Sequence, residues 1–140
     1  MTTVKLSKNL QNPRGVYSIP VTPFHEDGKL DLDSLRKCIE FCLEKGAHGI
    51  VMPVNASEVS TLTDEERTQV IKEGVKSVNG SVHFVAGVTG NSIEQVQESV
   101  KIVEDLGVDS IITMPSTKIA SAQYVYAVSY THLTLPTMLP

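Results

Sequence analysis

The sequence predicts an α/β fold in which short parallel strands alternate with helices. Three observations support this class: short apolar runs recur along the chain, amphipathic patterns separate them, and no hairpin signal joins two neighbouring runs. A strand, a crossover helix and a second parallel strand form the unit that this order builds. We therefore expect a parallel sheet that is covered by helices.

The expected elements follow one another from the amino end. Strands are expected at Val16–Thr22, Gly49–Met52, His83–Gly87 and Ser110–Met114. The helices between them each carry one apolar stripe at helical spacing. These stripes contain Leu35, Cys38, Ile39, Cys42 and Leu43 in the first helix, Val70, Ile71, Val75 and Val78 in the second, and Ile93, Val96, Val100 and Val103 in the third. Gly46 and Gly107 are expected to end helices just before similar strands, which indicates an internal βα repeat.

The stretch from Gly49 to Arg67 is where catalytic or binding residues are most expected. Gly49–Met52 is continuously apolar, as parallel strands buried on both faces are. Thr63 and Glu66 have the spacing of a capping box, and the acidic residues between them favour the positive end of a helix dipole. Residues 54–62 are therefore predicted to form a loop at the carboxyl end of a parallel strand, where α/β proteins place their sites.

Composition excludes several classes of protein. The chain has 140 residues, 41% of them hydrophobic, and a formal net charge of −4. No cluster of basic residues in the sequence suggests a nucleic-acid partner. No apolar run approaches the roughly 20 residues needed to cross a membrane, and the first ten residues lack the apolar core of a signal peptide. We expect a cytoplasmic protein of single-domain size, with no nucleic-acid or membrane partner.

Metal chemistry is not expected from the cysteines and histidines. Cys38 and Cys42 lie on the apolar stripe of the first helix without the spacing of a zinc site, so they are expected to be buried thiols. His25, His48 and His83 are scattered singly, whereas a metal site needs several ligands that converge.

Several segments in order resemble the first half of the dihydrodipicolinate synthase and N-acetylneuraminate lyase family. They are Gly15-Val16 through Thr22-Pro23-Phe24, the Asp27-Gly28 turn, the Gly49 to Arg67 stretch, and Val85-Ala86-Gly87-Val88 with Asn91-Ser92. The resemblance covers residues 12–126. It implies a (β/α)8 TIM barrel, here truncated to about four βα units, from a homo-oligomeric parent. Members are class I aldolases and related lyases, in which a lysine forms an imine with pyruvate or another 2-oxo acid, without a cofactor.

The resemblance also implies where the substrate binds. The family's loop after the second strand commonly reads Gly, Thr or Ser, Thr, Gly, Glu and holds the pyruvate carboxylate; the same places here are Val54-Asn55-Ala56-Ser57-Glu58. Asn55, Ala56 and Ser57 are thus the expected substrate-binding residues, with an altered backbone where two glycines are absent. Glu58 is expected to be a hydrogen-bond acceptor that holds the loop, with an acid–base role as the alternative.

A fourth expected substrate-binding residue follows the last strand. Synthases commonly show Pro and two tyrosines there, whereas this chain has Pro115-Ser116-Thr117. Thr117 supplies a hydroxyl in the place of a phenol, which is the better proton relay. These departures favour a lyase acting on a different 2-oxo acid, or a separate branch of the family, over dihydrodipicolinate synthase activity itself.

The length predicts that this chain alone is inactive. A complete barrel takes about 250 residues. The resemblance places the imine-forming lysine on the sixth strand and a central tyrosine near the fifth, so no catalytic residue is expected within these 140 residues. Lys118 is the one lysine expected in a loop at the catalytic end. Residues 1–126 are expected to form the aldolase half-barrel. Residues 127–140 are similar to one reading frame of the adapter used in transposase-based sequencing libraries and are expected to be non-native.

A second class of function stays open at this point. The chain could be a non-catalytic α/β module used for binding or assembly, either a degenerate family member or a phosphate-binding doubly wound domain. The segment Gly87–Asn91 lies between a strand and a helix, and a helix N-terminus of this kind can hold a phosphate. An imine-forming lysine in the parent would distinguish the enzyme from such a module.

Overall fold

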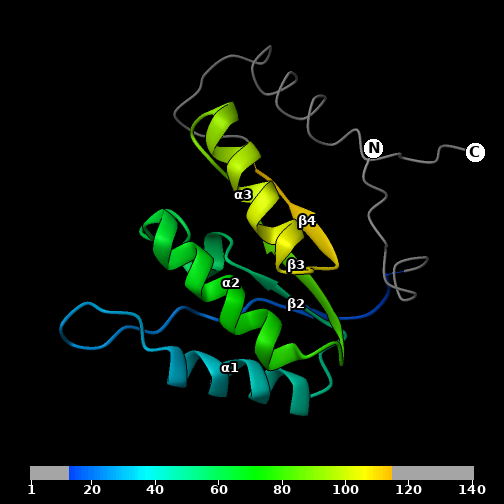
Figure 1. The fold of residues 1–140 in the computed structure, drawn as a ribbon. Helices are drawn as coiled ribbons and strands as arrows, with labels where there is room; N and C mark the ends of the chain where they lie inside the picture. The colour runs from blue at the N-terminus through cyan, green and yellow to red at the C-terminus, as the bar shows by residue number, and fades with distance from the viewer. Residues whose placement is uncertain (1–12, 115–140) are drawn as a thin grey trace, which may run out of the picture.

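The computed structural model describes residues 13–114, which form a four-stranded parallel sheet with three α-helices. In chain order the elements are β1 (Tyr17–Ser18), α1 (Leu32–Glu44), β2 (Gly49–Met52), the 3-10 helix η2 (Asn55–Ser57), α2 (Asp64–Val78), β3 (His83–Gly87), α3 (Ile93–Asp105) and β4 (Ser110–Ile112). The strands lie side by side in chain order, and every neighbouring pair is parallel (Figure 1). The predicted alternation of strands and helices is confirmed.

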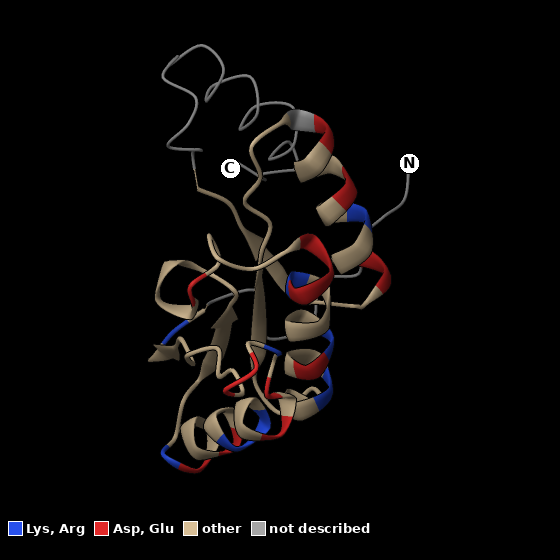
Figure 2. Ribbon diagram, turned by 90° about the vertical axis from the view of Figure 1, so that its left-hand side faces the viewer, with Lys and Arg blue, Asp and Glu red and all other residues tan. Residues whose placement is uncertain are grey.

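The three helices cover one face of the sheet, as Figure 2 shows from the side, and they carry most of the charged residues. Ile50, Met52, Phe84 and Ala86 are at most 2% exposed and belong to the core beneath the helices. Gly74 of α2 lies so close to the Phe84 ring and the Met52 sulfur that any side chain there would collide with the ring. Alternate residues of β2 and β3 therefore pack against the helices.

The sheet order excludes the doubly wound alternative. A doubly wound sheet has helices on both faces and a point where the strand order reverses. Here the order runs β1-β2-β3-β4 without reversal, and the helices lie on a single face. This is the arrangement of consecutive βα units along the wall of a barrel.

Local signals explain where the helices begin and end. The Thr63 side chain accepts a hydrogen bond from the Glu66 amide, and the Glu66 carboxylate accepts one from the Thr63 amide, so the predicted capping box is confirmed. At the starts of α1 and α3 only one side chain caps the helix: Asp31 accepts from the Ser34 amide, and Ser92 accepts from the Gln95 amide. Gly46 and Gly107 follow α1 and α3 with φ of 84° and 72°, a backbone conformation that favours glycine.

Two of the predicted strands are shorter than the apolar runs that suggested them. The run Val16–Thr22 forms a strand only at Tyr17–Ser18, because the carbonyl of Pro20 accepts from a loop hydroxyl instead of joining the ladder. The run Ser110–Met114 ends its strand at Ile112, because the Met114 amide donates to the Thr89 side chain instead of to a strand carbonyl. In both cases, loop contacts displace the last ladder bonds.

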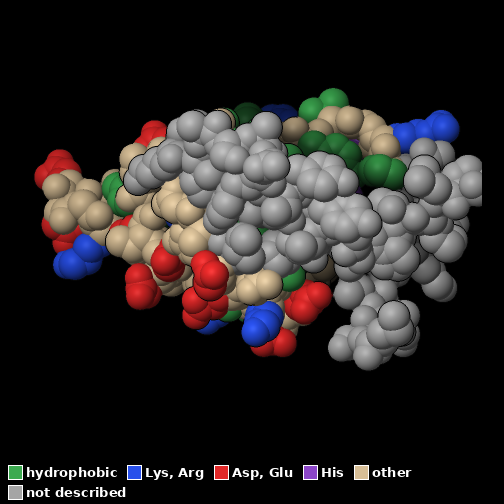
Figure 3. Space-filling model, turned by 90° about the horizontal axis from the view of Figure 1, so that it is seen from above, with side chains coloured by type: hydrophobic (Ala, Val, Ile, Leu, Met, Phe, Trp, Pro, Cys, Tyr) green, Lys and Arg blue, Asp and Glu red, His purple; other side chains and the backbone are tan. Residues whose placement is uncertain are grey.

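The sheet face opposite the helices carries a polar hydrogen-bonded row and exposed apolar residues. The Tyr17 hydroxyl lies 2.7 Å from His83 Nδ1, and His83 Nε2 lies 2.9 Å from Ser110 Oγ. Ile19, directly after β1, and Ile112, at the end of β4, are 43% and 40% exposed. In Figure 3 acidic side chains gather on one flank of the molecule and hydrophobic side chains appear on the opposite flank. Within residues 13–114, no helix covers the face of the sheet opposite α1, α2 and α3.

The burial of the two cysteines differs from the sequence prediction. Cys38 and Cys42 are free and half-buried, so the prediction of buried thiols was wrong in degree; both lie at the margin of the α1 stripe whose centre is Leu35 and Ile39. None of the helices in the described part is long and apolar enough to cross a membrane.

Candidate functional site

The candidate site lies where the carboxyl ends of β2, β3 and β4 meet at one edge of the sheet. Parallel strands bring the loops that follow them to the same edge. Hydrogen bonds continue between these segments: the Val88 amide donates to the Ile112 carbonyl at 2.9 Å, and the Met114 amide donates to the side-chain Oγ1 of Thr89 at 3.1 Å. The β3–α3 loop is thus joined to the end of β4.

The loop after β2 is an ordered turn. Val54 has an extended backbone with φ of −137°, so the absence of a glycine there requires no left-handed conformation. The amides of Ser57 and Val59 both donate to the Val54 carbonyl. Glu58 instead adopts the left-handed conformation, with φ of 58°. The altered sequence therefore places its positive φ at the fifth residue of the loop motif.

Ser57 is fully buried and attaches this loop to the end of the first strand. Its hydroxyl donates to the Pro20 carbonyl at 2.8 Å, and its own carbonyl accepts from Thr22 Oγ1 at 2.8 Å. Both bonds are shielded from water, where leaving either partner unsatisfied is costly. The Ser57 hydroxyl thus has a protein acceptor.

Asn55 and Ala56 form the exposed tip of the loop. Among residues 13–114, no acceptor engages the backbone amides of Asn55 and Ala56 or the Asn55 side-chain amide. Hydrogen-bond donors that lack protein partners at an exposed turn are available to water or to an anion. The tip can therefore donate several hydrogen bonds toward the sheet edge.

Glu58 has an exposed side chain beside this tip. Its backbone carbonyl accepts from the Thr61 amide at 3.0 Å and from Thr61 Oγ1 at 2.8 Å. Within the described residues the Glu58 carboxylate forms no hydrogen bond or ion pair, so the prediction that it holds the loop as an acceptor is met only by its backbone.

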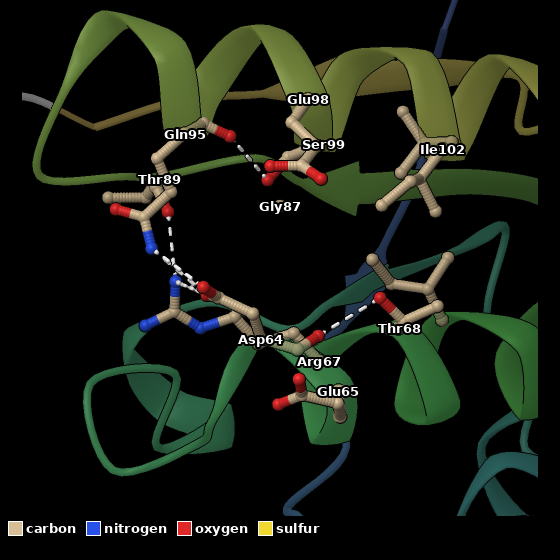
Figure 4. A pocket seen from close by; sticks show the side chains of 12 residues that line it. Asp64, Glu65, Arg67, Thr68, Gly87, Thr89, Gln95, Glu98, Ser99 and Ile102 are labelled. Carbon is tan, nitrogen blue, oxygen red and sulfur yellow. Dashed lines mark hydrogen bonds and ion pairs between the residues drawn. The ribbon is translucent and has the colours of Figure 1, made fainter.

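Arg67 joins two of the site loops from the helix side. Its Nη2 donates to the Val59 carbonyl at 3.0 Å, and its Nη1 donates to the Thr89 carbonyl at 3.3 Å. Asp64 pairs with Nη1 at 3.4 Å and also accepts from Gln95 Nε2 at 2.9 Å. Figure 4 shows these side chains meeting across a groove of about 420 Å³ between α2 and α3.

The sequence prediction missed Arg67 and Gln95. One signal was present: a cation near the start of a helix is disfavoured by the dipole, so an arginine at the fourth helical residue indicates a specific partner. Gln95 carries no comparable signal, because its position on an exposed helix face is ordinary for a polar residue. Thr117, the fourth expected substrate-binding residue, lies outside the described residues.

Displaced pKa values occur at exposed helix starts and turns near the described loops. The pKa of Glu94 lies below its ordinary value because its own backbone amide and then the Ser92 hydroxyl donate to the carboxylate. The pKa of Asp31 is lowered by hydrogen bonds from Ser34, the residue it caps. These shifts stabilise the charged carboxylates at the positive ends of α1 and α3.

The histidines of the described part are spread over separate contacts. His25 pairs with Asp31 at 3.8 Å, His48 accepts from the Val16 amide, and His83 lies in the polar row of the opposite sheet face. No three of the His, Cys, Asp and Glu side chains in residues 13–114 are grouped so that they could hold a metal ion.

Comparison with known proteins gives a consistent set of relatives. The model of the dihydrodipicolinate synthetase family matches residues 12–126. The 4-hydroxy-tetrahydrodipicolinate synthase of Methanococcus maripaludis (strain C5) is 40% identical over 99 residues, which are 71% of this chain and 34% of the relative. A probable 5-dehydro-4-deoxyglucarate dehydratase 2 of Streptomyces avermitilis is 36% identical over 110 residues, covering 79% of this chain and 33% of the relative.

Solved structures agree with this picture. The chloride-inhibited dihydrodipicolinate synthase from Acinetobacter baumannii, complexed with pyruvate, superposes with a TM-score of 0.74 at 34% identity, covering 83% of this chain and 42% of that one. The synthase from Aquifex aeolicus superposes with a TM-score of 0.77 at 28% identity, covering 84% and 40%. The chain spans about a third of the length of the curated relatives it matches.

Proposed function

The chain belongs to the dihydrodipicolinate synthetase family, and from this premise we propose that it forms the N-terminal part of a Schiff-base lyase acting on pyruvate or another 2-oxo acid. The observation that carries the proposal is the family match over residues 12–126. Support comes from a relative in this fold that was crystallised with pyruvate. The fold is the TIM barrel of these relatives, represented in residues 13–114 by four parallel strands and the three α-helices between them.

The proposed reaction uses a lysine from a later part of the barrel. The lysine amine adds to the 2-oxo carbon and water leaves, which produces a protonated imine. The imine withdraws electrons from the adjacent carbon, so a carbon–carbon bond can form or break there. Lysine and imine chemistry need no metal or organic cofactor. The role left to residues 13–114 is to bind and orient the substrate.

Substrate binding is assigned in this proposal to the tip of the β2–α2 loop. The amides of Asn55 and Ala56 and the Asn55 side chain are donors at the carboxyl edge of the sheet. A 2-oxo acid presents a carboxylate, and hydrogen bonds to a charged group are the stronger ones. Ser57 would fix the tip from below through its bond to Pro20. Thr117 would add a hydroxyl from the loop after β4.

The proposal extends to the organisation of the whole protein. Residues 1–126 would belong to the barrel, and residues 127–140 would be the non-native adapter-derived segment. The complete enzyme would be a homo-oligomer of the cytoplasm with a small 2-oxo acid as its substrate. The two named kinds of relative, a synthase and a probable dehydratase, support a 2-oxo acid lyase whose product differs between members.

Borohydride trapping tests the proposal directly. The full-length protein, incubated with pyruvate and reduced with borohydride, should gain one covalent adduct per chain on a lysine of the later barrel, as measured by mass spectrometry. The 140-residue chain treated identically should gain none. A full-length protein that folds and gains no adduct would favour the non-catalytic module, and a stoichiometric adduct on Lys118 of the short chain would contradict the assignment of the lysine.

A further inference from the structure

Arg67 occupies an unfavourable place for a cation. It is the fourth residue of α2, directly after the first turn and near the positive end of the helix dipole, and its side chain is only 18% exposed. Its Nε is buried without an acceptor among residues 13–114. A charged group that is removed from water in this way needs compensating partners.

The compensating partners are backbone carbonyls of two different loops. Nη2 donates to Val59 in the loop after β2, and Nη1 donates to Thr89 in the loop after β3. The planar guanidinium holds two separate nitrogens in a fixed fork, one for each carbonyl, whereas an ammonium offers its donors from a single nitrogen. Arg67 therefore connects the two loops at the carboxyl edge of the sheet.

A second set of contacts holds this connection from α3. Asp64 pairs with Arg67 and accepts from Gln95 Nε2 at 2.9 Å and 3.2 Å through its two oxygens. Gln95 Oε1 accepts from the Asn91 amide at 2.7 Å, beside the start of α3. Figure 4 shows Arg67, Asp64 and Gln95 turned toward one another across the groove. The start of α2 is thus joined to the start of α3.

Two anchors hold the β2–α2 loop just after its tip. At the first, Ser57 is held by Pro20 and Thr22 next to the first strand. At the second, Val59 is held by Arg67. The Asn55 side-chain amide, exposed and without an acceptor in the described part of the chain, lies just before the first anchor.

We propose that Arg67 is a positioning residue that holds the β2–α2 loop in the conformation needed to bind the 2-oxo acid carboxylate. The inference rests on the proposed function, because it assigns the substrate to the loop that Arg67 holds. Arg67 itself does not reach the tip residues; it acts through the Val59 carbonyl and through its connection to Thr89.

Amide hydrogen exchange on the 140-residue chain tests the anchoring without any substrate. In Arg67→Met, the amides of Ser57, Glu58 and Val59 should exchange about tenfold faster or more, since two charge-assisted bonds are lost. Amides in the β2–β3 ladder should change little. Arg36→Met is the matched control, because Arg36 pairs with Glu73 between α1 and α2 and contacts no site loop. Equal acceleration of loop and ladder amides in Arg67→Met would overturn the anchoring role.

A milder variant protects the test against loss of the fold. Arg67→Lys keeps the charge but replaces the two-nitrogen fork by one nitrogen, so its loop amides should exchange at rates between those of the original chain and Arg67→Met. Exchange in Arg67→Lys that equals the original would show that charge alone suffices, which contradicts a two-loop connection.

Kinetics of the full-length protein test the consequence for substrate. Arg67→Lys should raise the KM for pyruvate about tenfold, with kcat within about a factor of three, and Arg36→Lys should leave both unchanged. If the unsubstituted protein forms no imine with pyruvate, the proposed function fails. If it forms the imine and Arg67→Lys leaves KM unchanged, the positioning role is overturned.

Discussion

Asn55 offers the most direct test of the site at the scale of a single residue. In the full-length protein, Asn55→Ala should raise the KM for the 2-oxo acid about tenfold or more, because a hydrogen bond to a charged group is lost. The measurement is steady-state kinetics with pyruvate as the varied substrate. Asn55→Thr combined with Ala56→Thr restores the residues usual at these places and should keep KM low.

The contrary result for Asn55 is equally informative. If KM stays constant through every change at Asn55 and Ala56 while the protein remains folded, the carboxylate is bound elsewhere. The assignment of the β2–α2 loop would then be wrong, although the fold would be unaffected.

Gly87 tests the packing beneath the site. A Cβ added at Gly87 would overlap the backbone carbonyl of Pro53, which cannot move as a side chain can. Gly87→Ala should therefore lower the free energy of unfolding by about 1–3 kcal/mol, measured by denaturant titration. Gly90→Ala is the control: its nearest contact is a Val96 methyl group at 3.0 Å, so it should cost less. Equal losses in both variants would contradict the backbone clash.

At this scale the sequence predicted the position of the β2–α2 loop better than the contacts that hold it. The loop after β2 and its exposed residue Asn55 could be predicted, because strand, loop and helix cap are local patterns. That the Ser57 hydroxyl donates to Pro20 could not, since the two residues meet only through the sheet. The contacts of Arg67 with Val59 and Thr89 likewise depend on how α2 packs beside two loops.

At the scale of elements, strong patterns gave accurate boundaries and edge strands did not. β2 and β3 match their predicted ranges, because a central strand is flanked by partners along its whole apolar run. β1 and β4 are shorter than predicted, because each has one neighbouring strand among the described residues and loses its last residues to loop contacts. Hydrophobicity marks a run of residues, and pairing decides how much of it is strand.

The cap of α2 carries a prediction at the same scale. Thr63→Ala removes the side-chain half of the capping box and should lower the free energy of unfolding by about 1 kcal/mol. Thr68→Ala is the matched control, since its hydroxyl donates only to the Asp64 carbonyl within the helix. Thermal or denaturant unfolding measures both variants. A Thr63→Ala protein as stable as the original would show that the cap contributes nothing net.

At the scale of the whole molecule, the uncovered sheet face predicts self-association of the 140-residue chain. Ile19 and Ile112 are exposed on the face without helices, and β1 and β4 each leave an edge without a strand partner in residues 13–114. Exposed edges and apolar faces favour pairing between chains. Sedimentation velocity should show oligomers whose proportion rises with protein concentration.

A pair of substitutions locates the associating surface. Ile112→Lys places a charge on the uncovered face and should shift the chain toward monomer. Phe41→Lys is the control, because Phe41 is exposed on α1, away from this face. A monomer that unfolds in one sharp cooperative transition before any substitution would contradict the prediction.

The anchors of the β2–α2 loop have a consequence for how the molecule can change. Pro20, Val59 and Thr89 receive their hydrogen bonds at backbone carbonyls, which every amino acid possesses. A mutation at any of these three acceptors therefore keeps the carbonyl that accepts the bond. Only the donors, Ser57 and Arg67, require a particular side chain. The tip that precedes these anchors, Asn55 and Ala56, can vary without loss of their hydrogen bonds. Under the proposed function, substrate preference can therefore change at Asn55 and Ala56 while Ser57 and Arg67 keep the loop folded.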